Sequence, residues 1–435
     1  MIYIWSVKDI MESYGQILIT VIPIFLIMIL AEYIYSWYKK DNLMNINDLV
    51  SSLSSGLTNI TKDILGLSIG IISYGWMVGH LALFTIEESW LVYVVAFIVI
   101  DFQGYWTHRW SHHINIFWNR HIIHHSSEYF NLACALRQSI SAIFNLFTFL
   151  LLPAAIIGIP HSVIAILAPL HLFAQFWYHT IYIGKMGFLE KIIVTPSHHR
   201  VHHAINPEYQ DKNLSQVFIF WDKIFGTFQE ELHHIPPVYG ITRPAHSWNP
   251  IKINYQHLWL LIQDAWRARS WLDKIRIWFM PTGWRPEDVV QAYPVRKIND
   301  PYHFDRYHTH SSTGLKVFIC VQMFYLQFFI FYFLSHLSDF NTSGIFLYGG
   351  FIGLSVYALT DLMDRNRSAL FFEVLKNFLG LAILQSTQGW FYSSEFIPGI
   401  QPALAIYFVL SSVVAAWFVY THWKEDHQFV IASGA

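Results

Sequence analysis

Three short runs of histidine have the spacing of metal ligands. They read HRWSH at 108–112, HIIHH at 121–125 and HRVHH at 199–203. Residues three or four apart share one face of an α-helix, so each run can direct two or three imidazoles at one point. The third run has a helix start signal, because Thr195 suits the N-cap and Pro196 the first helical position. The predicted ligands are His108, His112, His121, His124, His125, His199, His202 and His203.

Eight imidazoles exceed what one metal ion can bind while it also binds oxygen, so the pattern predicts two metal ions. The two cysteines, Cys134 and Cys320, are too few for a thiolate-rich zinc site. Imidazole alone also suits copper or zinc. A di-iron centre that activates O2 fits many nitrogen ligands beside an apolar region best. Isolated histidines are instead predicted to be interface anchors or hydrogen-bonded core residues; these are His161, His171, His233 and His234.

Several polar residues are candidates for orienting the ligand rings through hydrogen bonds. They are Asp101, Glu128, Asp211, Asp222 and His198. For each carboxylate, the alternative is an ordinary solvated or helix-capping role. Asp101 lies two helical turns before His108 and close to the bilayer, where a carboxylate usually has a partner. We expect that partner to be a histidine or Arg109.

The composition indicates that the elements holding these residues form an all-α, polytopic membrane helix bundle. Hydrophobic residues make up 54% of the 435 residues and charged residues only 13%. A net charge of −2, with no basic stripe, argues against nucleic-acid binding. Nine apolar segments are predicted to span the bilayer: 16–37, 65–84, 90–106, 139–160, 162–179, 314–336, 344–363, 369–386 and 402–421. Residues 65–84 and 369–386 are the weakest, and either could be re-entrant or interfacial.

Lysine and arginine are distributed as the positive-inside rule predicts for a cytoplasmic histidine site. If Lys39 and Lys40 are cytoplasmic, alternating spans place all three histidine runs on the same side. The first apolar segment is predicted to be a retained anchor. Three regions follow: an N-terminal membrane bundle at 1–180, a cytoplasmic histidine-rich catalytic section at 181–313 and a second membrane bundle at 314–435.

The ordered runs resemble the histidine boxes of the fatty acid hydroxylase and sterol desaturase superfamily. Further motifs are similar to the alkylglycerol monooxygenase family within it. They include NLACALRQS (131–139), QFWYHT (175–180), WDKIFGTF (221–228), PTGWRPED (281–288) and LMDRNRSALFFEVLK (362–376). This resemblance covers nearly the whole chain, including the C-terminal bundle that plain sterol desaturases lack.

The resemblance implies a membrane monooxygenase with two iron ions and O2 as co-substrate. Such an enzyme hydroxylates the carbon next to the ether oxygen of an alkylglycerol, and the product breaks down to a fatty aldehyde and glycerol. The family's reductant is tetrahydrobiopterin. A ninth metal ligand, between the second and third boxes, corresponds to His179 in QFWYHT. No haem or flavin fingerprint is visible, so the electrons must come from a small molecule or a separate protein.

Two other functions fit parts of the pattern. One is a hydroxylase or desaturase of another lipid, such as a fatty acyl chain or a sterol, that uses a separate redox carrier. The other is a histidine-based metal transporter. A transporter should carry ionisable residues near the middle of several spans, whereas most of the clustered histidines lie at the predicted cytoplasmic ends of the spans.

Overall fold

The protein is mostly helical and has very few strands, as the composition predicts. The computed structural model describes residues 7–41, 43–70, 72–387, 389–391, 393–395 and 397–433. The α-helices are α1 (Val7–Lys39), α2 (Ile46–Ile64), α3 (Tyr74–Leu81), α4 (Trp90–His113), α5 (Asn115–Trp118), α6 (Ile122–His125), α7 (Leu152–Ile157), α8 (His161–Phe173), α9 (Pro196–His202), α10 (Phe220–Phe225), α11 (Pro250–Arg267), α12 (Trp271–Arg276), α13 (Glu287–Ala292), α14 (Thr313–Ser335), α15 (Thr342–Met363), α16 (Ser368–Ser386) and α17 (Ile400–Ser433).

Short 3-10 helices and one small sheet connect these helices. The 3-10 helices are η1 (Leu132–Leu136), η2 (Phe147–Leu151), η3 (Gly187–Lys191), η4 (Pro301–His303), η5 (Leu337–Asp339) and η6 (Ser393–Glu395). The strands β1 (Ile69–Gly70) and β2 (Phe144–Asn145) pair in parallel, with Ile69 opposite Phe144.

Six helices within the described residues are long and apolar enough to cross a membrane. They are Gly15–Lys39 of α1, α4, α14, α15, α16 and Ile400–Glu425 of α17. The chain is therefore a multi-pass membrane protein. The prediction of nine spans is wrong for the described residues, because three of the predicted segments fold differently.

None of the three segments forms one continuous helix long enough to span a membrane. Residues 65–84 contain β1 and the short helix α3, and a left-handed Gly66 follows the end of α2. Residues 139–160 contain β2, η2 and α7, and the left-handed Gly158 caps α7. Residues 162–179 contribute only the 13-residue α8 and the turns after it. A helix of that length is about 20 Å long, which is less than the hydrocarbon core of about 30 Å.

The helix α16 contains two charged side chains, Glu373 and Lys376. They form an ion pair inside the C-terminal bundle, so α16 can still be a membrane-spanning helix. The Nζ atom of Lys376 lies 2.6 Å from an Oε atom of Glu373, and both residues are buried. The amide of Gln322 on α14 donates to the same carboxylate at 2.9 Å. An ion pair that is satisfied in this way is the form in which charged residues usually occur within membranes.

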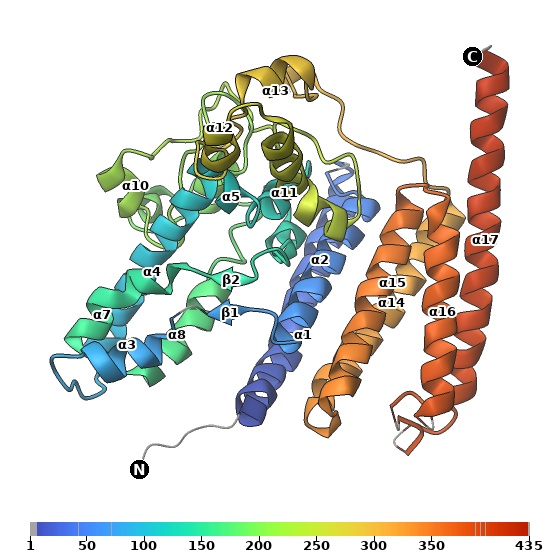
Figure 1. Cartoon of the computed structure of the whole chain (residues 1–435), viewed down its shortest axis with the longest axis horizontal. Coiled ribbons are helices and arrows are strands. Elements are labelled where there is room, and N and C mark those ends of the chain that lie inside the picture. The colour runs from blue at the N-terminus through green and yellow to red at the C-terminus, as the bar shows by residue number, and fades with distance from the viewer. Residues whose placement is uncertain are drawn as a thin grey trace.

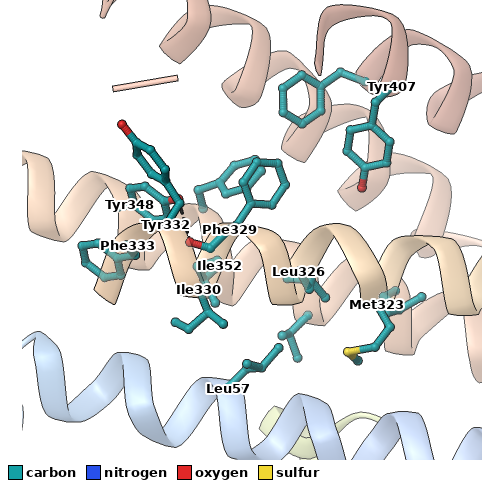
Figure 2. Packing of buried hydrophobic residues seen from close by; sticks show 14 of the residues in the cluster. Leu57, Met323, Leu326, Phe329, Ile330, Tyr332, Phe333, Tyr348, Ile352 and Tyr407 are labelled. Atoms are coloured by element: carbon teal, nitrogen blue, oxygen red, sulfur yellow. Dashed lines mark hydrogen bonds between the residues drawn. The ribbon is translucent and has the colours of Figure 1, made fainter. Parts of the chain in front are cut away.

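The hydrophobic core of the C-terminal bundle continues into the N-terminal helices. The helices α14 to α17 pack in sequence, while α1 packs on α14 and α2 on α15. Figure 2 shows Leu57 of α2 facing Leu326 and Ile330 of α14, and all three belong to one buried cluster. The division of the chain at 180 and 313 stays a prediction.

The short helices between α4 and α14 gather mainly at one end of the molecule. In Figure 1, α5 and α10 to α13 lie together at the upper end of α4, whereas α1 begins at the lower end of the molecule. The helix α17 packs beside α16 and rises from the lower end of the molecule, so that its last residues lie at the top. Which end faces the cytoplasm stays a prediction.

Candidate metal centre

The nine predicted ligands come from four separate segments that meet at the upper end of α4. That helix carries His108 and His112 in its last turns. The single-turn helix α6 ends with His124 and His125, and His121 lies at its N-cap. His179 follows α8, and the third box forms α9 with His203 as its C-cap. Seven of the nine side chains are buried: His108, His112, His125, His179, His199, His202 and His203. The other two, His121 and His124, are partly buried.

Local sequence explains why α9 presents its histidines so precisely. Pro196 occupies the first turn, and Thr195 forms a capping box with His198. The Thr195 backbone N–H donates to Nδ1 of His198 at 3.3 Å. The ring of His198 therefore caps the N-terminus of α9. A residue that orients a metal ligand would instead hydrogen-bond to the ring of that ligand.

The histidines form two neighbouring groups, each compact enough to surround one metal ion. One group contains His108, His112, His121, His125 and His202, and the other contains His124, His179, His199 and His203. Within each group, one nitrogen of every ring lies within 4.8 Å of the corresponding nitrogens of the others. The structure thus brings together all nine residues that the sequence predicted as ligands.

The spacing of the nitrogens matches that of ligands on a shared ion. With metal–nitrogen bonds of about 2.1 Å, two nitrogens at a right angle lie about 3 Å apart. In the second group the Nε2–Nε2 distances are 2.8 Å for His179–His199, 3.0 Å for His199–His203 and 3.0 Å for His124–His203. In the first group they are 2.9 Å for His108–His121, 3.1 Å for His121–His125 and 3.2 Å for His112–His125.

Hydrogen bonds on the far side of several rings direct a lone pair into the site. Nδ1 of His108 donates to the carbonyl of Leu214 at 2.7 Å, and Nδ1 of His202 donates to that of Lys212 at 3.0 Å. A carbonyl oxygen only accepts, so the proton lies on Nδ1 and the Nε2 lone pair points inward. The buried Nε2 of His202 has no hydrogen-bond partner among the described residues. This unpartnered lone pair is what a bound metal ion would use.

Burial keeps these rings neutral, which is the form that binds metal. It lowers the pKa of His179 to about 4. Burial, reinforced by the neighbouring imidazoles, also holds the pKa well below its usual value for His121, His124, His125, His199, His202 and His203.

Among Asp211, Asp222 and Glu128, only Asp211 hydrogen-bonds to a predicted ligand. The other two accept hydrogen bonds from backbone N–H groups. Nδ1 of His112 donates to Asp211 at 3.1 Å. Asp222 accepts from the backbone N–H groups of Leu214 and Ser215 at 2.7 and 2.9 Å, and so fixes the loop whose carbonyl bonds His108. Glu128 accepts from the backbone N–H of Tyr307.

The partner of Asp101 is a histidine, as expected, but not one of the predicted ligands. An oxygen of Asp101 lies 2.7 Å from Nε2 of His171 on α8, and both side chains are buried. The same carboxylate accepts from the backbone N–H groups of Val217 and Phe218 at 2.9 and 3.0 Å. Asp101 thus joins α4, α8 and the 217–218 loop. Arg109 instead donates to Tyr105 and to the carbonyl of Phe225.

Glu32 is a positioning residue that the sequence analysis did not identify. It is buried in α1, where it accepts from Thr180 Oγ1 at 2.6 Å and from the backbone N–H of Leu132 at 2.7 Å. Thr180 follows His179, so this carboxylate ties the ninth predicted ligand to α1. The available signal was a glutamate within an apolar span, which usually marks a functional contact.

Two cavities reach the histidines from different sides. The first, which we call the α1–α8 cavity, has a volume of about 570 Å³ and is lined by apolar side chains of both helices, including Phe25, Leu172 and Phe173. It touches five of the histidines: His108, His121, His124, His179 and His199.

The second, which we call the α11 cavity, has a volume of about 430 Å³. It lies beside α11 and the 282–285 and 295–298 segments, and it touches His112, His125, His202 and His203. Each cavity therefore reaches ligands of both groups, and the candidate metal centre lies between them.

Comparison with known proteins shows the family to which this chain belongs. Residues 93–227, which contain all nine histidines, match the fatty acid hydroxylase family. Human alkylglycerol monooxygenase is 32% identical over 407 residues, which cover 91% of this chain and 87% of the human protein. The chain belongs to the alkylglycerol monooxygenase family. The resemblance seen in the motifs is thereby confirmed, and the chain is an oxidoreductase.

Other relatives show both near and distant similarity. An alkylglycerol monooxygenase of Danio rerio is 30% identical, covering 90% of this chain and 86% of that protein. A Delta(7)-sterol 5(6)-desaturase of Gibberella zeae is 27% identical over 182 residues, which cover 38% of this chain and 52% of the desaturase. No solved structure matches the chain.

Proposed function

We propose that this protein hydroxylates the carbon next to the ether oxygen of alkylglycerols and so releases a fatty aldehyde and glycerol. The observation that carries the proposal is a pair of compact histidine groups at the end of an apolar cavity. Two iron ions held by these groups would activate O2 for insertion of one oxygen atom into a C–H bond, with electrons from an external reductant. Family membership supports the choice of an ether lipid as substrate.

The reaction balances with one O2, two electrons and two protons. The CH2 group beside the ether oxygen gains a hydroxyl group, and the other oxygen atom leaves as water. In the resulting hemiacetal the hydroxyl proton moves to the ether oxygen and the C–O bond breaks. The products are an aldehyde and the free hydroxyl of glycerol.

The chain contributes ligand orientation and substrate alignment to this reaction. Carbonyls of Leu214 and Lys212, and the carboxylate of Asp211, hold ligand rings in one tautomer and orientation. The apolar walls of the α1–α8 cavity exclude water and align an alkyl chain with the histidines. Such alignment determines which carbon reacts, because the oxidant itself discriminates poorly.

We propose that tetrahydrobiopterin, the reductant implied by the family, binds in the α11 cavity. This cavity meets the histidines from a different side than the lipid cavity, so both molecules can be present together. It offers the aromatic walls of Trp118 and Trp284 and the polar side chains of Thr242 and Thr282. A flat heterocycle with several hydrogen-bonding groups suits such a lining.

A substrate screen tests the proposal. The protein is purified anaerobically with iron, supplied with O2 and a tetrahydropterin, and offered an alkylglycerol, a fatty acid or a sterol. We expect pterin-dependent release of fatty aldehyde from the alkylglycerol. An intact hydroxylated or unsaturated acyl chain or sterol would instead support a hydroxylase or desaturase of another lipid, to which the similarity with the Gibberella zeae desaturase points.

A further inference from the structure

The α1–α8 cavity contains a cation that has no carboxylate partner in the described part of the chain. Arg120 lines this cavity and immediately precedes the predicted ligand His121. Its guanidinium lies 4.9 Å from the centre of the Phe147 ring. Among the residues that the structure describes, no hydrogen bond or carboxylate reaches the Arg120 side chain. A guanidinium stays charged in proteins and offers five N–H donors in a planar fork.

The other charged groups of this cavity are already paired. Lys62 lies 3.2 Å from Asp63, and Arg137 lies 2.7 Å from Asp48 on α2. Each of these cations therefore has its own carboxylate. The charge of Arg120 remains, in a cavity where apolar walls make an uncompensated charge costly.

Lys62 and Arg120 are linked across the same end of the cavity. Nζ of Lys62 donates to the carbonyl of Ser139 at 3.3 Å, and the Ser139 and Ser141 hydroxyls lie 3.0 Å apart. The Ser141 hydroxyl donates to the carbonyl of Asn119, next to Arg120, at 3.1 Å. The part of the cavity wall near Arg120 is therefore polar, whereas α1 and α8 contribute apolar side chains.

We infer that Arg120 binds an anionic headgroup, so that the preferred substrate is an ether lipid carrying a phosphate monoester, such as a 1-O-alkylglycerol 3-phosphate. This inference rests on the proposed function and specifies its substrate class. Arginine binds phosphate through paired, charge-assisted hydrogen bonds. The hydroxyls of a neutral alkylglycerol also accept hydrogen bonds, but they leave the charge uncompensated.

The connectivity of the substrate suits this placement. Successive Cα atoms lie about 3.8 Å apart, so Arg120 and His121 extend into the cavity from nearly one point of the chain. In the phosphate-bearing lipid, only the ether oxygen and the glycerol separate the reacting carbon from the phosphate. Binding of phosphate at Arg120 would therefore hold the reacting carbon near the histidines.

The test compares aldehyde release from a 1-O-alkylglycerol and from its 3-phosphate with the same alkyl chain. We expect the wild-type protein to show the higher kcat/KM for the phosphate. In Arg120→Gln this preference should fall by about 10- to 100-fold, which is the loss typical of hydrogen bonds to a charged group. Equal kcat/KM values in the wild-type protein, or an unchanged ratio in Arg120→Gln, would overturn the inference.

A matched control is Arg109→Gln. Arg109 also adjoins a predicted ligand, His108, but donates to Tyr105 and Phe225 and is not part of the cavity lining. Its substitution should leave the substrate ratio unchanged.

Inhibition of the wild-type protein gives an answer even if Arg120→Gln fails to fold. An alkyl phosphate should inhibit at lower concentration than the alcohol of the same chain length, and equal inhibition would contradict the inference. If neither ether lipid yields aldehyde, the proposed function itself fails. If the neutral lipid alone yields aldehyde, only the headgroup inference fails.

Discussion

The hydrogen bonds of each buried ring separate structural histidines from predicted ligands. Nε2 of His171 is used by Asp101, so this ring ties helices together. Nδ1 of His179 donates to the carbonyl of Gln175 at 3.0 Å, and its Nε2 faces His199 and His124. The two side chains lie eight residues apart in the sequence, yet only the second has a nitrogen available for metal.

Replacing His179 should remove one of the two metal ions and leave the other bound. It belongs to the group of four ligands and lies outside the three boxes. In His179→Ala we expect iron content to fall from about two to about one per chain, because the other group keeps its ligands. Activity should fall by more than about 100-fold, since even partners of ligands typically contribute 10- to 100-fold. Metal analysis and aldehyde release measure the two effects.

An exposed histidine provides the control for this experiment. His234→Ala removes an imidazole from the surface and should change neither iron content nor activity. Full iron content in His179→Ala would show that His179 is not a ligand.

Protonation of buried histidines should make the metal-free protein sensitive to acid. Burial, with a smaller contribution from Arg243, lowers the pKa of His257 in the α11 cavity to about 4. Unfolded histidine binds a proton near pH 6.5, so stability is lost as the pH falls from about 6.5 toward 4. This residue alone should contribute about 1 kcal/mol to the loss at pH 5.5.

The unfolding temperature of chelator-treated protein measures this effect between pH 7.5 and 5.5. In His257→Gln the decline should be shallower than in the wild-type protein, because the substituted side chain takes up no proton. Identical slopes in the two proteins would contradict the assignment.

At the scale of elements, a buried ion pair joins α2 to the segment after the second box. Arg137 lies just after η1 and pairs with Asp48 of α2, and both side chains are at most 2% exposed. The guanidinium also donates to the Ser126 hydroxyl at 2.7 Å, next to His125. The position of α2 and the geometry of the second box are thereby coupled.

Breaking this pair should destabilise the protein strongly. Arg137→Met leaves Asp48 buried without its partner, which typically costs about 3–5 kcal/mol. We expect a lower unfolding temperature in detergent and reduced iron content. The double variant Arg137→Met/Asp48→Leu should recover much of the stability, because no uncompensated charge remains. Equal stability of the single variant and the wild-type protein would show that the pair contributes little.

Elements with strong local signals could be predicted from the sequence, and those shaped by tertiary contacts could not. Thr195 and Pro196 correctly located the start of α9, and helical spacing brought His108 and His112 onto one face. The helix α2 was missed because its buried residues include Ser51, Ser52, Ser54 and Ser55, which resemble a loop composition. The carbonyls that orient His108 and His202 were invisible in the sequence, because any residue type supplies one.

At the scale of the whole molecule, the helices place the histidines and the last turns of α17 at the same end. In Figure 1, α4 runs upward to the α5 and α10–α13 region, and α17 ends at that same end of the molecule. Side-chain contacts join the two regions there, since Lys252 of α11 lies 2.5 Å from Asp361 of α15. We propose that this end faces the cytoplasm.

Labelling of single cysteines tests this orientation. The exposed Cys320 is first replaced by serine, and Cys134 is buried. A membrane-impermeant maleimide should label Ser343→Cys, on the α15 end opposite the histidines, in intact cells. It should label Asn299→Cys only after the membrane is opened. The reverse pattern would contradict the cytoplasmic placement of the metal centre.

The most direct test of the central claim is the iron content of active protein, combined with X-ray absorption at the iron edge. Two groups of converging imidazoles predict about two iron ions per chain, nitrogen-rich first shells and scattering from a second iron nearby. An active protein with one iron per chain, or with no iron neighbour in the absorption spectrum, would contradict the two-metal centre.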